Sequence, residues 1–193
     1  MVTVACVRVG RKYNDDYVLK LRAGVAKHLP VAHEFVCFTD KAIDGVTCRD
    51  AGPLPGWWAK LSLFSLGQPL LYFDLDLIIV GDLTPLVEWD GFGIMRDPKQ
   101  PGGLGSAVMK LTGDERHVWE EFRPDIMSKM HGDQDWITRC MPKARTFPPQ
   151  WFPSFKFGAM SKPPEGALAM NFHGFPKPHQ VTSGWVKEAW AFT

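Results

Sequence analysis

The stretch from residue 70 to residue 80 places two carboxylates, Asp74 and Asp76, among nine apolar or aromatic residues. An ionised carboxylate in apolar surroundings either takes up a proton or finds a compensating charge. Alternate residues of an extended strand point to the same side, so both side chains can face one point in space. A divalent cation there would remove their mutual repulsion and the cost of burial. The alternative is a strand end whose two Asp side chains face solvent or cap a turn.

The elements that would position this pair alternate between strand and helix in the first half of the chain. The apolar patterns predict strands over residues 2–9, 34–39, 46–48, 69–73, 91–96 and 106–110. They predict helices over residues 14–29, 57–66, 115–130 (interrupted at Pro124) and 133–140. This order is typical of an α/β protein with a mostly parallel sheet flanked by helices.

Beyond Met141 the composition changes. Eight of the 16 prolines fall between Pro142 and Pro178, so we expect a loop-rich, Pro/Gly-rich C-terminal part that lies over the sheet. A length of 193 residues favours a single domain over residues 1–193.

Candidate ligand-binding residues follow the predicted strands. In open α/β sheets, ligands bind outside the carboxyl ends of the strands. Asp74 and Asp76 follow the strand at 69–73, the segment from Tyr13 to Tyr17 follows the first strand, and Thr39-Asp40 follows the second. These places should gather along one rim of the sheet. Asp40 there either binds a nucleoside or caps a turn.

Composition narrows the class of partner and the compartment. The net charge is +1 and there is no basic run, which argues against a nucleic-acid partner. No apolar stretch is long enough to span a membrane, and the N-terminus has no signal-peptide pattern. The four cysteines have no metal-ligand spacing and are expected to be reduced and buried. We therefore expect a cytoplasmic protein.

Five ordered blocks of the sequence resemble GT-A fold nucleotide-sugar glycosyltransferases, particularly the glycogenin-like members of glycosyltransferase family 8. The blocks are NDDYV at residues 14–18, AKL at 59–61, YFDLD at 72–76, GDQD at 132–135 and GFPKP at 174–178. The resemblance runs from Val2 to about His179. It implies a Rossmann-like GT-A fold and transfer of a sugar from a UDP-sugar to a hydroxyl acceptor, with retention of anomeric configuration.

The same resemblance implies a metal site. Asp74 and Asp76 match the family's Asp-x-Asp pair, which holds Mn²⁺ (Mg²⁺ is the alternative) against the diphosphate of the donor. The family spacing puts the third ligand six residues before Lys177, at Asn171, whereas the nearby imidazole belongs to His173. Imidazole is the commoner ligand of transition metals, so we favour His173 over Asn171.

Further residues match family positions that bind the donor. Lys177 matches a lysine that contacts the diphosphate, and Lys60 matches one near the ribose and sugar. Tyr17 matches the aromatic residue that stacks on uracil. Each also has a structural explanation: a solvated surface lysine, an exposed helix charge and a core tyrosine, respectively.

Residues nearer the reacting sugar are Asp133, Gln134 and Ser106. In the family the Asp hydrogen-bonds donor-sugar hydroxyls and the Gln lies close to the anomeric carbon, although an acidic residue at position 133 would also suit a helix N-terminus. Ser106 matches an Asn-Ser-Gly strand, but Gly105 and Ala107 replace the Asn and the Gly, which leaves the donor sugar open. For acceptor contact the candidates are Trp151 and Trp136, although most tryptophans are core residues.

Two other functions are compatible with the pair. Haloacid-dehalogenase-like phosphohydrolases also carry Asp-x-Asp after an apolar strand, but near the N-terminus and with Thr or Val four residues after the first Asp. Here Ile78 holds that place, and the pair begins at residue 74. A catalytically inactive sugar-nucleotide-binding module is the third possibility, because Gly105 departs from the family pattern.

Overall fold

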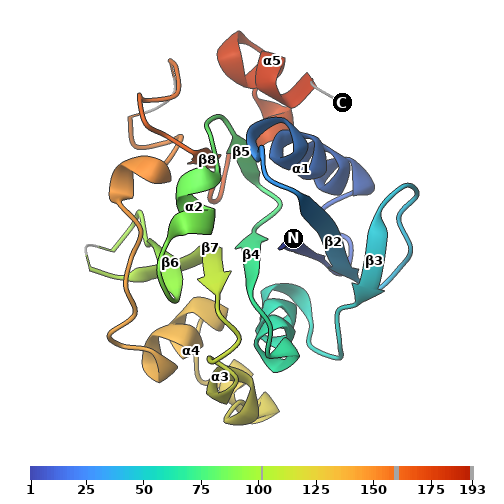
Figure 1. Cartoon of the computed structure of the whole chain (residues 1–193), viewed down its shortest axis with the longest axis vertical. Coiled ribbons are helices and arrows are strands. Elements are labelled where there is room, and N and C mark those ends of the chain that lie inside the picture. Colours follow the sequence, from blue (N-terminus) through green and yellow to red (C-terminus); the bar gives the residue numbers. More distant parts are fainter. Residues whose placement is uncertain (101, 159–160, 192–193) are drawn as a thin grey trace.

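The core of the molecule is a six-stranded sheet. The computed structural model describes residues 1–100, 102–158 and 161–191. The sheet order is β3-β2-β1-β4-β7-β6, and β4 runs through the centre of the view in Figure 1. The strands are β1 (Val2–Arg8), β2 (His33–Thr39), β3 (Thr47–Asp50), β4 (Leu70–Phe73), β6 (Gly93–Arg96) and β7 (Leu104–Leu111). β1 to β4 are parallel where they pair, and β7 is antiparallel to both β4 and β6. The predicted mostly parallel α/β sheet is confirmed.

Helices cover both faces of this sheet. The α-helices are α1 (Asp15–His28), α2 (Thr84–Glu88), α3 (His117–Glu120), α4 (Asp133–Cys140) and α5 (Gly184–Ala191). The 3₁₀ helices are η1 (Gly56–Leu66), η2 (Pro124–Ser128), η3 (Pro149–Trp151) and η4 (Pro178–Gln180). Apolar side chains of α1 and α2 pack on one face of the sheet, and those of η1, α3 and α4 pack on the other.

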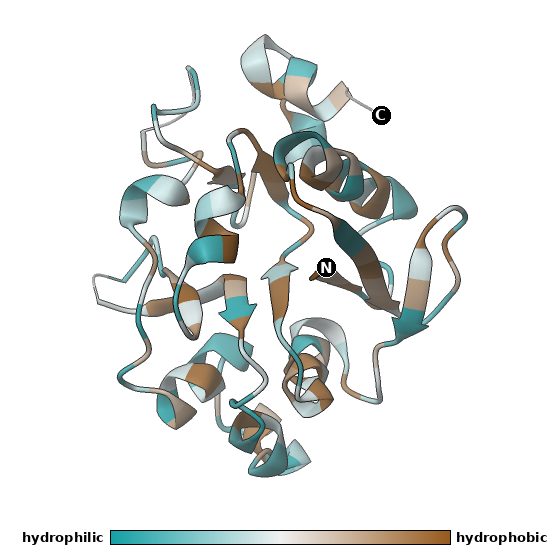
Figure 2. Cartoon of the chain, in the orientation of Figure 1, coloured by the Kyte–Doolittle hydropathy of each residue, from teal (hydrophilic) through white to brown (hydrophobic). Residues whose placement is uncertain are grey.

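The alternation of side chains along the strands supplies both apolar layers. In β4, Leu71 and Phe73 join the core beneath α1, whereas Leu70 and Tyr72 join the core beneath η1. Figure 2 shows the apolar residues gathered on the central strands and the polar ones on the outer parts of helices and loops. Among the described residues, no helix combines the length and the apolar character needed to cross a bilayer.

The predicted elements agree with the structure in the large sheet, with differences in the helices and in a second sheet. The segment 115–130 forms two short helices, α3 and η2, separated before Pro124 where the sequence predicted an interruption. The segment 57–66 is helical but winds as a 3₁₀ helix. The sequence did not predict α2 or α5. It also missed a second sheet, in which β5 (Leu77–Ile79) pairs antiparallel with β8 (Ala169–Asn171).

The Asp74–Asp76 segment links the two sheets. β4 ends at Phe73 and β5 begins at Leu77, so the intervening Asp-Leu-Asp is the connection. The amide of Asp74 donates a 2.8 Å hydrogen bond to the carbonyl of Ala107 in β7. The carbonyl of Asp76 accepts a 3.1 Å hydrogen bond from the amide of Phe172, just after β8. Leu75 is buried in the core between the two carboxylates. The backbone that carries the pair is therefore fixed from both sides.

A substitution in the turn after β5 can test how tightly this turn packs against the chain that leads into β8. A Cβ atom at Gly81 would lie 2.3 Å from the carbonyl oxygen of Ala167, a backbone atom that cannot rotate away. We therefore expect Gly81→Ala to lower the free energy of unfolding by about 1–3 kcal/mol, measured by urea denaturation. Glu88→Ala, at an exposed position of α2, serves as the control and should change it by less than about 0.5 kcal/mol. Equal stability of the two variants would contradict this packing.

Candidate active site

A cavity of about 560 Å³ opens at the edge of the sheet where β1 and β4 end. Nucleotide-sized ligands occupy cavities of this order. Nine of the residues singled out from the sequence line it, and they come from both halves of the chain: Lys60, Asp74, Asp76, Ser106, Asp133, Gln134, Asn171, His173 and Lys177. The cavity thus unites the predicted site residues from blocks separated by more than one hundred positions.

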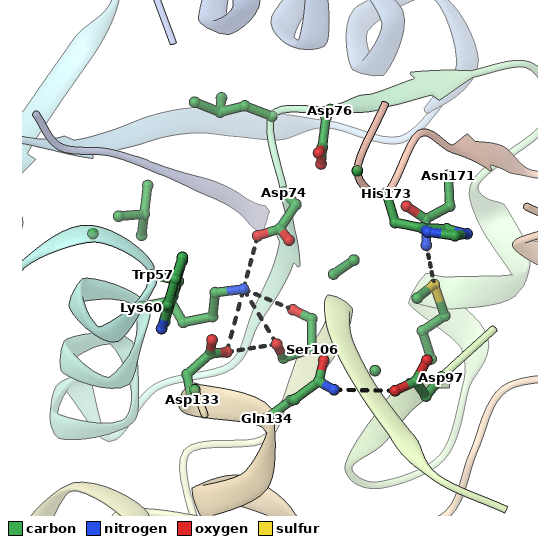
Figure 3. A pocket seen from close by; sticks show the side chains of 18 of the residues that line it. Trp57, Lys60, Asp74, Asp76, Asp97, Ser106, Asp133, Gln134, Asn171 and His173 are labelled. Atoms are coloured by element: carbon green, nitrogen blue, oxygen red, sulfur yellow. Dashed lines mark hydrogen bonds and ion pairs between the residues drawn. The ribbon is translucent and has the colours of Figure 1, made fainter. Parts of the chain in front are cut away.

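A buried lysine lies at the centre of the charged groups (Figure 3). The Nζ atom of Lys60 donates a 2.9 Å hydrogen bond to Asp74 Oδ1 and lies 3.3 Å from Asp133 Oδ2. It also donates a 3.2 Å hydrogen bond to the hydroxyl of Ser106. Burial opposes its charge, but the carboxylates of Asp133 and Asp74 outweigh burial and raise the pKa of Lys60 above its ordinary value. The ammonium therefore stays charged inside the protein.

Asp133 is the most buried carboxylate of the site. It begins α4 and accepts a 2.5 Å hydrogen bond from the Ser106 hydroxyl. Burial raises the pKa of Asp133, while the Lys60 ammonium works in the opposite direction. The next residue, Gln134, donates a 3.0 Å hydrogen bond from its amide nitrogen to Asp97. Asp97 was missed from the sequence, although it directly follows β6 and the strand-end rule applied to the other residues could have found it.

Asp76 forms an ion pair with a second lysine, Lys177. Lys177 is buried and its Nζ atom forms a very short ion pair with Asp76 and a 3.2 Å hydrogen bond with the carbonyl of Phe172. The hydroxyl of Tyr13 donates a 2.9 Å hydrogen bond to the same oxygen of Asp76. The sequence placed the segment from Tyr13 to Tyr17 at this rim but gave a role only to Tyr17, because nothing in the spacing separates the two tyrosines. Each carboxylate of the pair is thus held by one buried lysine and one tyrosine, because Tyr72 donates to Asp74 in the same way.

A metal ion needs several side-chain atoms that are free to bind it, and the residues expected to hold the metal offer some of these atoms. Hydrogen bonds engage Oδ1 of Asp74 and Oδ2 of Asp76, and none in the described part of the chain uses the second oxygen of either. His173 lines the same cavity. Its Nε2 atom is paired with the Ser154 hydroxyl at 2.7 Å, and its Nδ1 atom is buried without a hydrogen-bond partner. Within the described ranges, however, no three His, Cys, Asp or Glu side chains lie close enough together to hold a metal ion.

The other candidate ligand, Asn171, is also buried and lines the cavity. Its amide nitrogen lies 3.7 Å from the sulfur of Met95. Burial lowers the pKa of His173, and the positive charges of Lys99 and Lys156 add to this effect. A neutral imidazole with one nitrogen fixed by a hydrogen bond and the other unpaired is the form that binds metals. His173 therefore stays the predicted third ligand, with Asn171 as the alternative.

Four candidates from the sequence do not line this cavity. Tyr17 is buried, and its hydroxyl pairs with His179. Asp40 is exposed and binds Arg8 and the amide of Gly10, which lowers the pKa of Asp40. Trp136 is buried, and its indole nitrogen donates to the carbonyl of Val118. Trp151 packs against Trp89 and Phe147. The tryptophan that does line the cavity is Trp57, which was not singled out.

Solved glycosyltransferases share this fold. The chain superposes on the glycosyltransferase GlyE of Streptococcus pneumoniae TIGR4 with a TM-score of 0.73 and 15% identity, covering 98% of this chain and 60% of GlyE. For the galactosyltransferase LgtC in complex with donor and acceptor sugar analogues, the TM-score is 0.68 at 13% identity. The superposition covers 98% of this chain and 95% of LgtC. For mouse xyloside xylosyltransferase 1 the TM-score is 0.56 at 13% identity. The superposition covers 91% of this chain and 99% of that enzyme.

These similarities establish the fold as GT-A. The chain spans about 60% of the length of GlyE. No family model matches the sequence, and no curated protein matches it. Membership of glycosyltransferase family 8 therefore stays a prediction.

The network around Lys60 predicts a large cost when its charge is removed. Lys60→Met leaves the buried Asp133 and its neighbour Asp74 without their shared cation. Breaking a buried ion pair from one side costs about 3–5 kcal/mol, so we expect a loss of this size in urea denaturation. Lys187→Met, which removes an exposed lysine of α5, should change stability by less than about 0.5 kcal/mol. A loss below about 1 kcal/mol for Lys60→Met would mean that the site does not depend on its charge.

Proposed function

We propose that the protein is a metal-dependent glycosyltransferase that moves a sugar from a UDP-sugar to a hydroxyl acceptor with retention of anomeric configuration. The observation that carries the proposal is the pair Asp74–Asp76 at a cavity on a GT-A fold, with a buried lysine beside each carboxylate. This combination places fixed positive and negative groups where a sugar-nucleotide diphosphate would lie. Lysine ammonium groups suit a leaving group whose negative charge grows during the reaction.

The proposal gives a role to each of the charged and polar residues described above that lie nearest to the diphosphate and the donor sugar. Lys177 binds the diphosphate and stabilises charge on the leaving phosphate oxygen, and Lys60 lies near the ribose and sugar of the donor. Asp133, fixed by Lys60 and Ser106, accepts hydrogen bonds from hydroxyls of the donor sugar. Gln134, oriented by Asp97, lies beside the anomeric carbon. In the reaction the bond from the anomeric carbon to the phosphate oxygen breaks, a bond to the acceptor oxygen forms, and the acceptor proton passes to the released phosphate.

Mn²⁺, with Mg²⁺ as the alternative, is the proposed cofactor. The free oxygens of Asp74 and Asp76 and the Nδ1 atom of His173 would hold it. When bound, the cation supplies positive charge against the diphosphate. Lys60 and Lys177 already place a positive charge beside Asp74 and Asp76 without the metal.

The alternatives differ in what they require. A haloacid-dehalogenase-like phosphohydrolase would use Asp74 as a nucleophile, but Lys60 and Tyr72 both occupy one oxygen of that carboxylate. The GT-A fold also favours glycosyl transfer over this chemistry. An inactive sugar-nucleotide-binding module would keep the same cavity and bind the donor without turnover. Activity measurements separate the three.

The carboxylate pair provides the first test. Asp74→Asn and Asp76→Asn keep the shape of each side chain but remove its charge. We expect each to lower Mn²⁺-dependent release of UDP from a UDP-sugar by about 100-fold or more, because a preorganised electrostatic group is lost. Circular dichroism and thermal melting should show that both variants fold. Asp114→Asn, at an exposed position, is the matched control and should retain activity.

Two outcomes would count against the proposal. Full wild-type activity in excess EDTA would exclude the metal-dependent mechanism. Hydrolysis of an aryl phosphate that disappears in Asp74→Asn would favour the phosphohydrolase. A thermal-shift screen of UDP-, GDP-, ADP- and TDP-sugars, with and without Mn²⁺, identifies the nucleotide, and a shift with GDP-sugars alone would overturn the uridine assignment.

The third metal ligand can be tested by direct binding. His173→Ala removes the proposed imidazole, so we expect Mn²⁺ affinity to fall about tenfold or more when free Mn²⁺ is measured by electron paramagnetic resonance. Asn171→Ala should change this affinity less. The reverse order, with Asn171→Ala losing the metal and His173→Ala keeping it, would assign the ligand to Asn171.

A further inference from the structure

Tyr17, the residue that the family resemblance assigns to stacking on the base, is enclosed by other side chains. The ring of Tyr17 lies 4.7 Å from that of Tyr13, 4.8 Å from that of Trp190 and 5.8 Å from that of His179, measured between centroids. Tyr17 is 5% exposed and its hydroxyl is paired with His179. A base that entered the cavity would therefore meet Tyr13 before it could reach Tyr17.

Two other aromatic rings, those of Tyr13 and Trp57, lie at the cavity. Tyr13 and Trp57 both line it, and Trp57 is 53% exposed. No other aromatic ring in the described residues stacks on the indole of Trp57. The ammonium of Lys12 lies over both rings, 5.1 Å from the centroid of Tyr13 and 5.9 Å from that of Trp57. An exposed lysine side chain thus spans the gap between two aromatic surfaces.

We propose that Trp57, together with Tyr13, forms the surface on which the nucleobase of the donor stacks, and that Lys12 moves aside when the base enters. This inference rests on the proposed function, because it assumes a nucleotide-sugar donor. It replaces Tyr17 with Trp57 as the principal base-binding residue. Stacking on an indole needs no particular hydrogen-bond pattern, since every base has an aromatic face.

The position of Trp57 favours a base over an acceptor sugar. Ligands of α/β sheets bind at the point where the strand order reverses, and here β1 is flanked by β2 on one side and β4 on the other. Trp57 is the second residue of η1, three residues before Lys60, and lines the cavity together with Val7 of β1 and Val9 just beyond it. Figure 3 shows Trp57 beside Lys60, with Asp97 and His173 on the opposite side of the Asp74 carboxylate. A diphosphate at Asp74 would thus have its nucleoside toward Trp57.

The structure also leaves room for this indole. A Cβ atom at Gly132 would lie 3.3 Å from the indole nitrogen of Trp57, so glycine at this position lets the ring lie against the start of α4. The neighbouring Trp58, by contrast, is buried and packs against Phe122. Two consecutive tryptophans of η1 therefore have different tasks, one in the core and one in the cavity.

Calorimetric titration with UDP and with inorganic pyrophosphate, both in the presence of Mn²⁺, tests the proposal. For Trp57→Ala we expect UDP to bind about tenfold more weakly or worse, because base stacking is lost. Pyrophosphate, which has no base, should bind Trp57→Ala and wild type equally. Trp57→Phe should restore most of the UDP affinity. Equal UDP affinity of wild type and Trp57→Ala, or equal loss of both ligands, would overturn the assignment.

Fluorescence gives a second readout that a purely structural role would not alter. Stacking of uracil on the exposed indole should quench tryptophan emission on titration with UDP. Trp57→Phe should abolish most of this quenching while calorimetry still detects UDP. Trp119→Phe, a half-buried tryptophan of α3, is the control and should quench like wild type. If wild type binds neither UDP nor UDP-sugars, the proposed function itself fails. If it binds UDP and quenching persists in Trp57→Phe, only this inference fails.

Discussion

The buried ammonium of Lys60 is the constraint on which the site depends. It comes from η1 and meets Asp74 at the end of β4, Ser106 in β7 and Asp133 at the start of α4. Asp133 is buried, and burial pushes its pKa upward, so its ionised form needs a cation nearby. One side chain thereby ties two strands and two helices together at the floor of the cavity. A shift of any of these elements would separate charges that are mostly buried.

The second lysine ties the C-terminal part of the chain to the same point. Residues beyond 141 contain little regular structure, yet β8 pairs with β5 directly after Asp76. Lys177 then reaches back to Asp76 and to the carbonyl of Phe172, whose amide donates to the carbonyl of Asp76. The Asp-Leu-Asp connection is therefore held between the large sheet and the small one. This explains how a segment of loops can supply His173 and Lys177 to the cavity in a defined geometry.

Local patterns in the sequence were sufficient for the large sheet and for most of the cavity. Apolar runs identified β1, β2 and β4, and the family resemblance identified nine residues that line the cavity, six of them inside the five motif blocks. β5 and β8 were missed because three-residue strands have no measurable period, and their pairing joins residues about ninety positions apart. The exposure of Trp57 could not be predicted either, because Trp58 has the same side chain and lies one residue away. Only the packing of η1 on the sheet decides which indole is buried.

The charges of the cavity support a donor that arrives with a cation. When all are ionised, the ammonium groups of Lys60 and Lys177 face the carboxylates of Asp74, Asp76 and Asp133, so the formal charge of this group is −1. A diphosphate alone would meet carboxylates as well as lysines, and the repulsion would be strong in a partly buried site. A divalent cation that accompanies the diphosphate reverses that balance. The two lysines already compensate part of the negative charge in the free protein, which is why the cavity can be charged and yet folded before any ligand binds.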